Sequence, residues 1–284
     1  MTFDSIKREI FNFQKTWPIF SSDREGLGIG KNLYGTHPFY MVMEDDGNSH
    51  GVFLMNSNAM EYAMIPAPGL VIRTIGGLFD FHIYTGPTPE NVIEQHTHFV
   101  GRPFIPPYWS LGFHLSKYGY DNLTNMEAAV NRTIDAEIPL DVVYADIDTM
   151  DGRKDFTYDK VNFAGLPKYF SEDLHNMGLR SVTILDPTIA NASNYKEWET
   201  FSNADAFIKW ENGKTIMAYA WPDEPIGFPD FFDENGRKAW IDTILDYTQT
   251  MQVDGLWIVR FSSLYFSPLI LLLGYERTWS CGST

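Results

Sequence analysis

The stretch DVVYADID, residues 141–148, decides the fold class of this chain. Its apolar run is almost continuous and then ends in acidic residues, which is typical of a parallel strand buried on both faces. Three similar runs are SLGFHL (110–115), SVTILDP (181–187) and DGLWIV (254–259), and helical stretches are expected at about 125–137, 166–177 and 237–250. This alternation predicts a parallel α/β sheet, either a barrel or an open doubly wound fold.

The chain before residue 100 has a different rhythm. Short strand-like runs alternate with turn residues between about 38 and 86, and the Asp45–Asn48 segment (DDGN) is typical of a hairpin. This spacing predicts an antiparallel β-sandwich. Thr88 followed by a proline then predicts the start of a helix that ends near Gly101. The stretch 188–235 is too long for an ordinary connection, and we interpret it as an insertion over one face of the later sheet.

Acidic residues follow two of the predicted parallel strands: Asp146 and Asp148 end one, and Asp186 ends the next. In (β/α) barrels the active site is built from loops at the carboxyl ends of the strands. Carboxylates at that edge can accept hydrogen bonds from sugar hydroxyls or act at the anomeric carbon. Each of them can equally be a turn or cap residue, as Asp186 before Pro187 illustrates.

The composition narrows the classes of function. A net charge of −16 and a pI near 4.7 argue against nucleic acid as a partner and against docking on an anionic membrane. The single cysteine, Cys281, excludes an internal disulfide and a cysteine-based zinc site, and the scattered histidines predict no metal site. The first residues lack the apolar core of a signal peptide, and the apolar stretch 264–273 is too short to span a membrane.

Long, ordered segments of the chain resemble glycoside hydrolase family 31, the α-glucosidases. The segments that carry the resemblance include KTWPIFSSD (15–23), NLYGTHPFYM (32–41), RTIGGLFDF (73–81), GRPFIPPYWSLGFHLSKYGY (101–120), PLDVVYADIDTMDGRKDFTYD (139–159), LHNMGLRSVTILDP (174–187) and FPDFF (228–232). The resemblance implies the C-terminal part of a β-sandwich domain at 1–100. It also implies the first half of a (β/α)₈ TIM barrel, strands 1–4, at 101–259, with the insertion at 188–235. The tail, 260–284, does not follow the family pattern.

The resemblance also implies roles for particular residues. Asp146 would bind hydroxyls of the glucosyl ring, Asp186 would lie nearby, and Asp23 would reach the leaving-group sugar from a loop of the sandwich. The residues implied to line the same subsite are Tyr118, Ile147, Ile184, Trp221 and Trp257. The implied substrates are α-glucosides such as maltose and malto-oligosaccharides, without a cofactor. The family implies the secretory pathway but does not choose among lysosome, endoplasmic reticulum, cell surface and secretion.

One departure from the family pattern affects the mechanism. Residues Asp254–Ile258 (DGLWI) match the family's strand that carries the nucleophile, but the nucleophile position itself is Val259. A retaining glycosidase needs one carboxyl group to attack and another to protonate the leaving oxygen. We therefore predict that the chain as written does not hydrolyse glycosides. We interpret the tail as a truncated or mis-spliced gene product of an α-glucosidase, and the alternative is a non-catalytic carbohydrate-binding or interaction protein.

Overall fold

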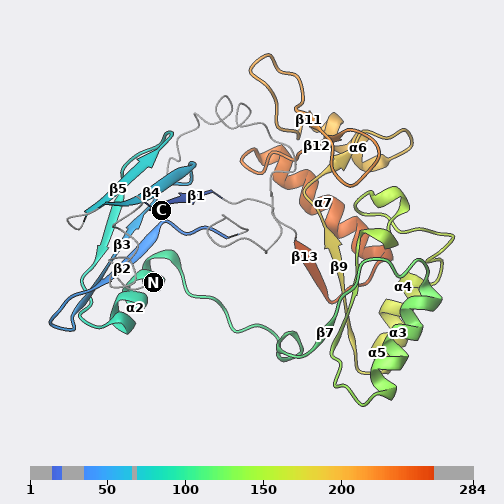
Figure 1. Cartoon of the computed structure of the whole chain (residues 1–284). Coiled ribbons are helices and arrows are strands. Elements are labelled where there is room, and N and C mark those ends of the chain that lie inside the picture. Colours follow the sequence, from blue (N-terminus) through green and yellow to red (C-terminus); the bar gives the residue numbers. More distant parts are fainter. Residues whose placement is uncertain (1–14, 21–34, 66–68, 259–284) are drawn as a thin grey trace. The chain divides into compact units, whose positions relative to one another are not determined.

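The computed structural model describes residues 15–20, 35–65 and 69–258 (Figure 1). The chain divides into two compact units, and the division falls between Phe104 and Ile105.

Among its described residues, the first unit contains two three-stranded antiparallel sheets, ordered β2-β3-β6 and β1-β4-β5. The predicted hairpin is confirmed: β2 and β3 pair across the 45–48 turn, where Gly47 has a φ of 86°. The wider β-sandwich stays a prediction. The strands are β1 (Lys15–Ile19), β2 (Phe39–Met43), β3 (Ser49–Leu54), β4 (Met60–Ile65), β5 (Gly69–Thr74) and β6 (Phe81–Tyr84).

Helix α2 (Pro89–Val100) packs directly on the β2-β3-β6 sheet. The Thr88 side chain accepts a hydrogen bond from the Asn91 backbone and so caps the helix as predicted. A Cβ at Gly51 of β3 would lie 2.5 Å from Val92 Cγ1, so only glycine allows this close approach. The buried His96 of the helix contacts the Tyr84 hydroxyl through Nδ1, at 3.0 Å. His96 is therefore a packing residue of this unit.

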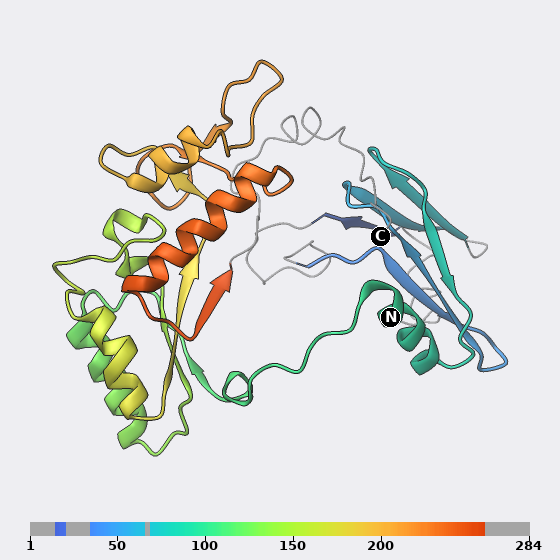
Figure 2. The same cartoon turned by 180° about the vertical axis from the view of Figure 1, so that it is seen from behind.

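The second unit is built on a four-stranded parallel sheet in the order β13-β9-β8-β7. The predicted parallel α/β sheet is confirmed, and Figures 1 and 2 show its helices packed along one side. The strands are β7 (His114–Leu115), β8 (Val142–Ala145), β9 (Arg180–Leu185) and β13 (Gly255–Ile258). The helices are α3 (Leu123–Asp135), α7 (Glu234–Thr250) and a continuous helical stretch made of α4 (Leu166–Lys168), the π-helical turn η4 (Tyr169–Asp173) and α5 (Leu174–Asn176).

The first predicted parallel strand, 110–115, is wrong over most of its length. Tyr108–Leu111 forms the short 3₁₀ helix η1, and only His114 and Leu115 pair with β8. The Asp141 carboxylate explains the difference, because its Oδ2 accepts from the Phe113 backbone N–H at 3.1 Å. A Cβ on Gly112 would lie 2.0 Å from the same Oδ2 atom. The Asp141 carboxylate therefore takes the Phe113 backbone N–H that would pair with the neighbouring strand if the predicted strand continued.

The chain between β9 and α7 forms a separate small antiparallel sheet, ordered β10-β12-β11, with one helix beside it. Tyr195, just before that helix, and Phe201 within it are buried in the main core of the unit. These elements are β10 (Ile189–Ala190), α6 (Lys196–Asn203), β11 (Met217–Ala218) and β12 (Ile226–Gly227).

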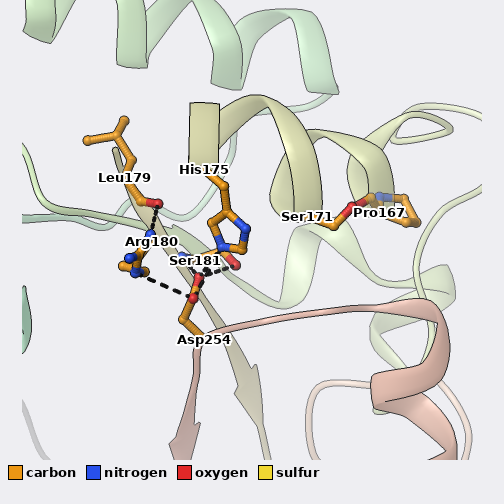
Figure 3. A network of polar contacts seen from close by, with 7 residues as sticks. All are labelled: Pro167, Ser171, His175, Leu179, Arg180, Ser181 and Asp254. Atoms are coloured by element: carbon orange, nitrogen blue, oxygen red, sulfur yellow. Dashed lines mark hydrogen bonds and ion pairs between the residues drawn. The ribbon is translucent and has the colours of Figure 1, made fainter. Parts of the chain in front are cut away.

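Asp254 holds the start of β13 against the start of β9 (Figure 3). Its Oδ2 accepts from the Ser181 backbone N–H at 2.8 Å and contacts His175 Nε2 at 2.9 Å. Its own N–H donates to the Ser181 carbonyl at 2.9 Å, and Arg180 Nε lies 3.6 Å from Oδ1. Because Ser181 is fully buried, its N–H would lack a partner without this carboxylate.

We expect Asp254→Ala to lower the free energy of unfolding of this unit by roughly 2–3 kcal/mol, the cost of a lost charge-assisted hydrogen bond and an orphaned buried donor. Asp254→Asn keeps an acceptor for Ser181 and should cost clearly less. Urea denaturation followed by circular dichroism measures both changes. Asp135→Ala, at an exposed carboxylate on α3, is the control. Equal stability of Asp254→Ala and the control would show that the contact does not fix the pairing.

Candidate functional site

The carboxyl ends of β8 and β9 place Asp146 and Asp186 at one edge of the sheet, because the two strands are parallel neighbours with Ala145 opposite Thr183. Asp146 follows β8 directly, and its Oδ1 accepts from the Ile147 backbone N–H at 2.7 Å. It thereby caps the short helix η2 (Ile147–Thr149). Asp146 has a structural role, as one reading of the sequence allowed, and its carboxyl group still lies at the edge where barrel loops build sites.

The sheet has two faces with different surroundings. Val143, Ala145 and Leu185 point to the side that packs against α3, α5 and α7. Residues one position away in the strands, among them Tyr144, Ile184 and Trp257, point to the opposite face. The Tyr144 and Trp257 rings meet edge to face, with their centroids 5.9 Å apart. We call this opposite face the inner face.

Four apolar side chains, which we call the apolar floor, pack together at this end of the sheet. Ile147, Met150 and Ile184 are buried together, and Trp257 packs against them. The structure therefore brings together three of the residues predicted for the subsite: Ile147, Ile184 and Trp257. Met150 was not predicted, and only its apolar type, four residues after Asp146, gave a signal for it.

The carboxyl groups at this edge have altered acidities. Burial raises the pKa of Asp186 to about 6, and the nearby negative charge of Asp146 adds to the effect. Burial also raises the pKa of Asp146; its hydrogen bond from Ile147 opposes this, and the charge of Asp148 adds to it. Within the described ranges, no lysine or arginine forms an ion pair with either group. The pair can accept hydrogen bonds from ligand hydroxyls, and it would favour a cationic group.

The third predicted strand-end acid, Asp148, serves the loop after β7 instead. Its Oδ2 accepts from the Tyr120 backbone N–H at 2.9 Å. This contact fixes the loop that carries Tyr118, whose side chain is exposed. Asp148 therefore holds the loop after β7 to the loop after β8.

The remaining predicted subsite residues are either exposed on loops or outside the described residues. Trp221 is exposed on the loop after β11, and its carbonyl accepts from Arg153 Nη1 at 3.2 Å. That contact joins its loop to the one after β8. Asp23 and Val259 lie outside the described residues. The roles of Tyr118 and Trp221 stay predictions.

A buried acid, Asp155, lies next to this edge of the sheet and was not predicted from the sequence. Asp155 is 3% exposed, and its Oδ1 accepts from the Asp186 backbone N–H at 2.9 Å. The two residues are 31 positions apart, and no local pattern marks the contact. Across the described residues, no group of three or more His, Cys, Asp or Glu side chains could hold a metal ion. None of the helices described is both long and apolar enough to cross a membrane.

Comparison with known proteins identifies the class. Residues 103–259, more than half of the chain, match the glycosyl hydrolases family 31 TIM-barrel domain. The chain therefore belongs to glycosyl hydrolase family 31, a family of glycosidases that includes α-glucosidases. The predicted family is confirmed, and of the two predicted α/β architectures the sheet is the barrel type.

The relatives are much longer proteins. The chain is 44% identical over 245 residues to probable maltase-glucoamylase 2 of Homo sapiens, covering 86% of this chain and 10% of that protein. It is 40% identical over 232 residues to lysosomal alpha-glucosidase of Rattus norvegicus, covering 81% and 24%. The solved family 31 alpha-glucosidase from Bacteroides thetaiotaomicron is 28% identical, with a TM-score of 0.76, covering 86% of this chain and 41% of that one. The chain thus spans between about a tenth and a quarter of the length of these two curated relatives.

We expect Asp186→Asn to change how stability depends on pH. A buried acid whose pKa rises from 3.8 to about 6 on folding keeps the native state at full stability below pH 3.8, and this contribution is lost as the pH rises to about 6. Asparagine cannot ionise, so the variant should gain stability relative to the parent between these two values. The gain at pH 7 is at most roughly 3 kcal/mol, from the size of the pKa change.

Urea denaturation at pH 4 and pH 7 measures this effect, with Asp135→Asn as the exposed control. A stability difference between Asp186→Asn and the parent chain that is the same at both pH values would contradict the raised pKa.

Proposed function

We propose that this chain is the glucosyl-binding part of a retaining α-glucosidase, that it binds terminal α-glucosyl units of maltose and malto-oligosaccharides, and that it does not itself cleave them. The observation that carries the proposal is the position of Asp146 and Asp186 beside the apolar floor of Ile147, Ile184 and Trp257, at the carboxyl edge of a family 31 barrel sheet.

The chemistry of the edge suits a sugar. Carboxylate oxygens accept hydrogen bonds from hydroxyl groups, and an indole face can pack against the C–H face of a pyranose ring. Asp146 would bind ring hydroxyls, with Asp186 close by. The apolar floor would limit water around these contacts, which strengthens them. Tyr118, Trp221 and Asp23 would complete the surroundings of the sugar, as the family resemblance implies.

The proposed absence of cleavage follows from the valine at position 259. A retaining glycosidase uses two carboxyl groups about 5–5.5 Å apart, one of which forms a covalent bond to the anomeric carbon. The resemblance assigns that group to position 259, where this chain has valine. Valine has no lone pair with which to attack, and the loss of a covalent nucleophile removes most of the rate enhancement.

The domain organisation belongs to the same proposal. Residues 1–100 would be the C-terminal part of a β-sandwich domain, and 101–259 would supply barrel strands 1–4. The stretch 188–235 would be an insertion of the barrel, and 260–284 would lie outside the family pattern. The two antiparallel sheets of the first unit and the division of the chain near residue 104 support this assignment.

We expect the full chain to bind maltose saturably in isothermal titration calorimetry and to release no glucose from it. Asp146→Asn should weaken binding about tenfold, the size expected for losing one hydrogen bond to a charged group. Asp135→Asn is the matched control and should bind as the parent does.

Two results would overturn the proposal. Absence of maltose binding by the parent chain would remove the binding role. Covalent labelling of the chain by a mechanism-based glycosyl inactivator, detected by mass spectrometry, would refute the absence of a nucleophile.

A further inference from the structure

The carboxyl group of Asp155 joins two loops that the sequence separates. It lies in the connection after β8, and it accepts from the backbone N–H of Asp186, the first residue after β9, at 2.9 Å. Its second oxygen is 3.5 Å from Thr188 Oγ1 in the same turn. The Asp155 carbonyl accepts from the Tyr195 hydroxyl at 2.8 Å, which ties it also to the segment before α6. All four residues are buried.

The backbone around Asp155 is held in an uncommon shape. Arg153 and Phe156 have φ values of 58° and 61°, in the left-handed region that side chains other than glycine rarely adopt. The Phe156 ring packs edge to face against Trp240 and Tyr247 of α7, at 5.2 Å and 5.8 Å. This anchored Phe156 turns the chain back and directs the preceding carboxyl group under the end of β9.

The electrostatics favour a neutral carboxyl group at this position. Burial raises the pKa of Asp155 well above its ordinary value, and the charge of Asp186 adds to this. The titratable groups around it are acidic or phenolic: Asp186 after β9, Tyr195 before α6 and Tyr247 of α7. A neutral carboxyl group offers one accepting oxygen and one O–H donor. The Asp186 N–H donates to one oxygen of this group, and the Thr188 hydroxyl faces the other at 3.5 Å.

We propose that Asp155 is a positioning residue: it holds the turn after β9 to the loop after β8 and thereby sets where the Asp186 carboxyl group lies beside Asp146. This inference rests on the proposed function, because the pair it positions is the one assigned to the glucosyl unit. Because Asp155 is buried, it would act on a ligand through Asp186. The contact requires a hydrogen-bond acceptor at Asp155.

Asparagine at position 155 tests that requirement, because its amide carries the same acceptor and donor as a neutral carboxyl group. Asp155→Asn should leave the Asp186 titration near its parent value and maltose affinity within about twofold. Asp155→Ala removes the acceptor and frees the turn, so the pKa of Asp186 should fall from about 6 towards 3.8 and maltose affinity should fall about tenfold. Asp159→Asn alters a partly exposed carboxylate of the same loop, which contacts Asn162, and is the control.

Carbon-13 NMR of chain labelled at aspartate carboxyl groups follows the titration of Asp186, with Asp186→Asn to assign the signal. Calorimetry gives the maltose affinity. If Asp155→Ala fails to fold, Tyr195→Phe removes only the hydroxyl that holds the Asp155 carbonyl, and it should move the Asp186 titration in the same direction by less.

The outcomes separate the two proposals. A folded Asp155→Ala variant with an unchanged Asp186 titration would overturn the positioning role. A loss of maltose affinity in Asp155→Asn as large as that in Asp155→Ala would also overturn it, because the negative charge of Asp155 would then be the property that matters. An unchanged Asp186 titration in Tyr195→Phe would overturn it where the alanine variant does not fold. A parent chain without maltose binding would refute the proposed function, while the titration of Asp186 would still decide the role of Asp155.

Discussion

The parallel pairing of β13 with β9 is the constraint on which the rest of the barrel sheet depends. Parallel neighbours have no hairpin turn to set their register, and a slip of one residue turns every side chain to the other face. Asp254 sets the register by exchanging backbone and side-chain hydrogen bonds with Ser181. With this register, Trp257 lies beside Ile184 on the inner face and Leu256 packs towards the helices.

The loop after β8 organises the opposite edge of the same sheet. Through Asp148 it holds the loop after β7, and through Asp155 it holds the turn after β9. Through Arg153 it contacts the loop at Trp221. One connection thus sets the positions of segments from three other parts of the unit. In barrel enzymes the site is assembled from such loops, and here the contacts of Asp148, Asp155 and Arg153 all come from a single loop.

The sequence predicted the elements that depend on local pattern. The apolar runs at 141–148 and 181–187 and the Thr88 cap correspond to β8, β9 and α2, because burial and capping leave a mark on neighbouring residues. The strand at 110–115 failed because a carboxylate 28 positions away takes its backbone donor. Asp155 was missed for the same reason, since its partner is distant in sequence and its conformation follows no period. The exposed side chains of Tyr118 and Trp221 make few packing contacts, so neither pattern nor packing fixes them.

The Asp254 contacts and the paired acids lie at opposite ends of the parallel sheet. The amino edge of the sheet therefore maintains the strand register, and the carboxyl edge carries the candidate site. For protein engineering, this separation makes the sheet a scaffold into which loops from another barrel can be grafted. The connection after β7 could be exchanged for that of a barrel with another specificity, while the strand register, maintained from the far end, remains as it is.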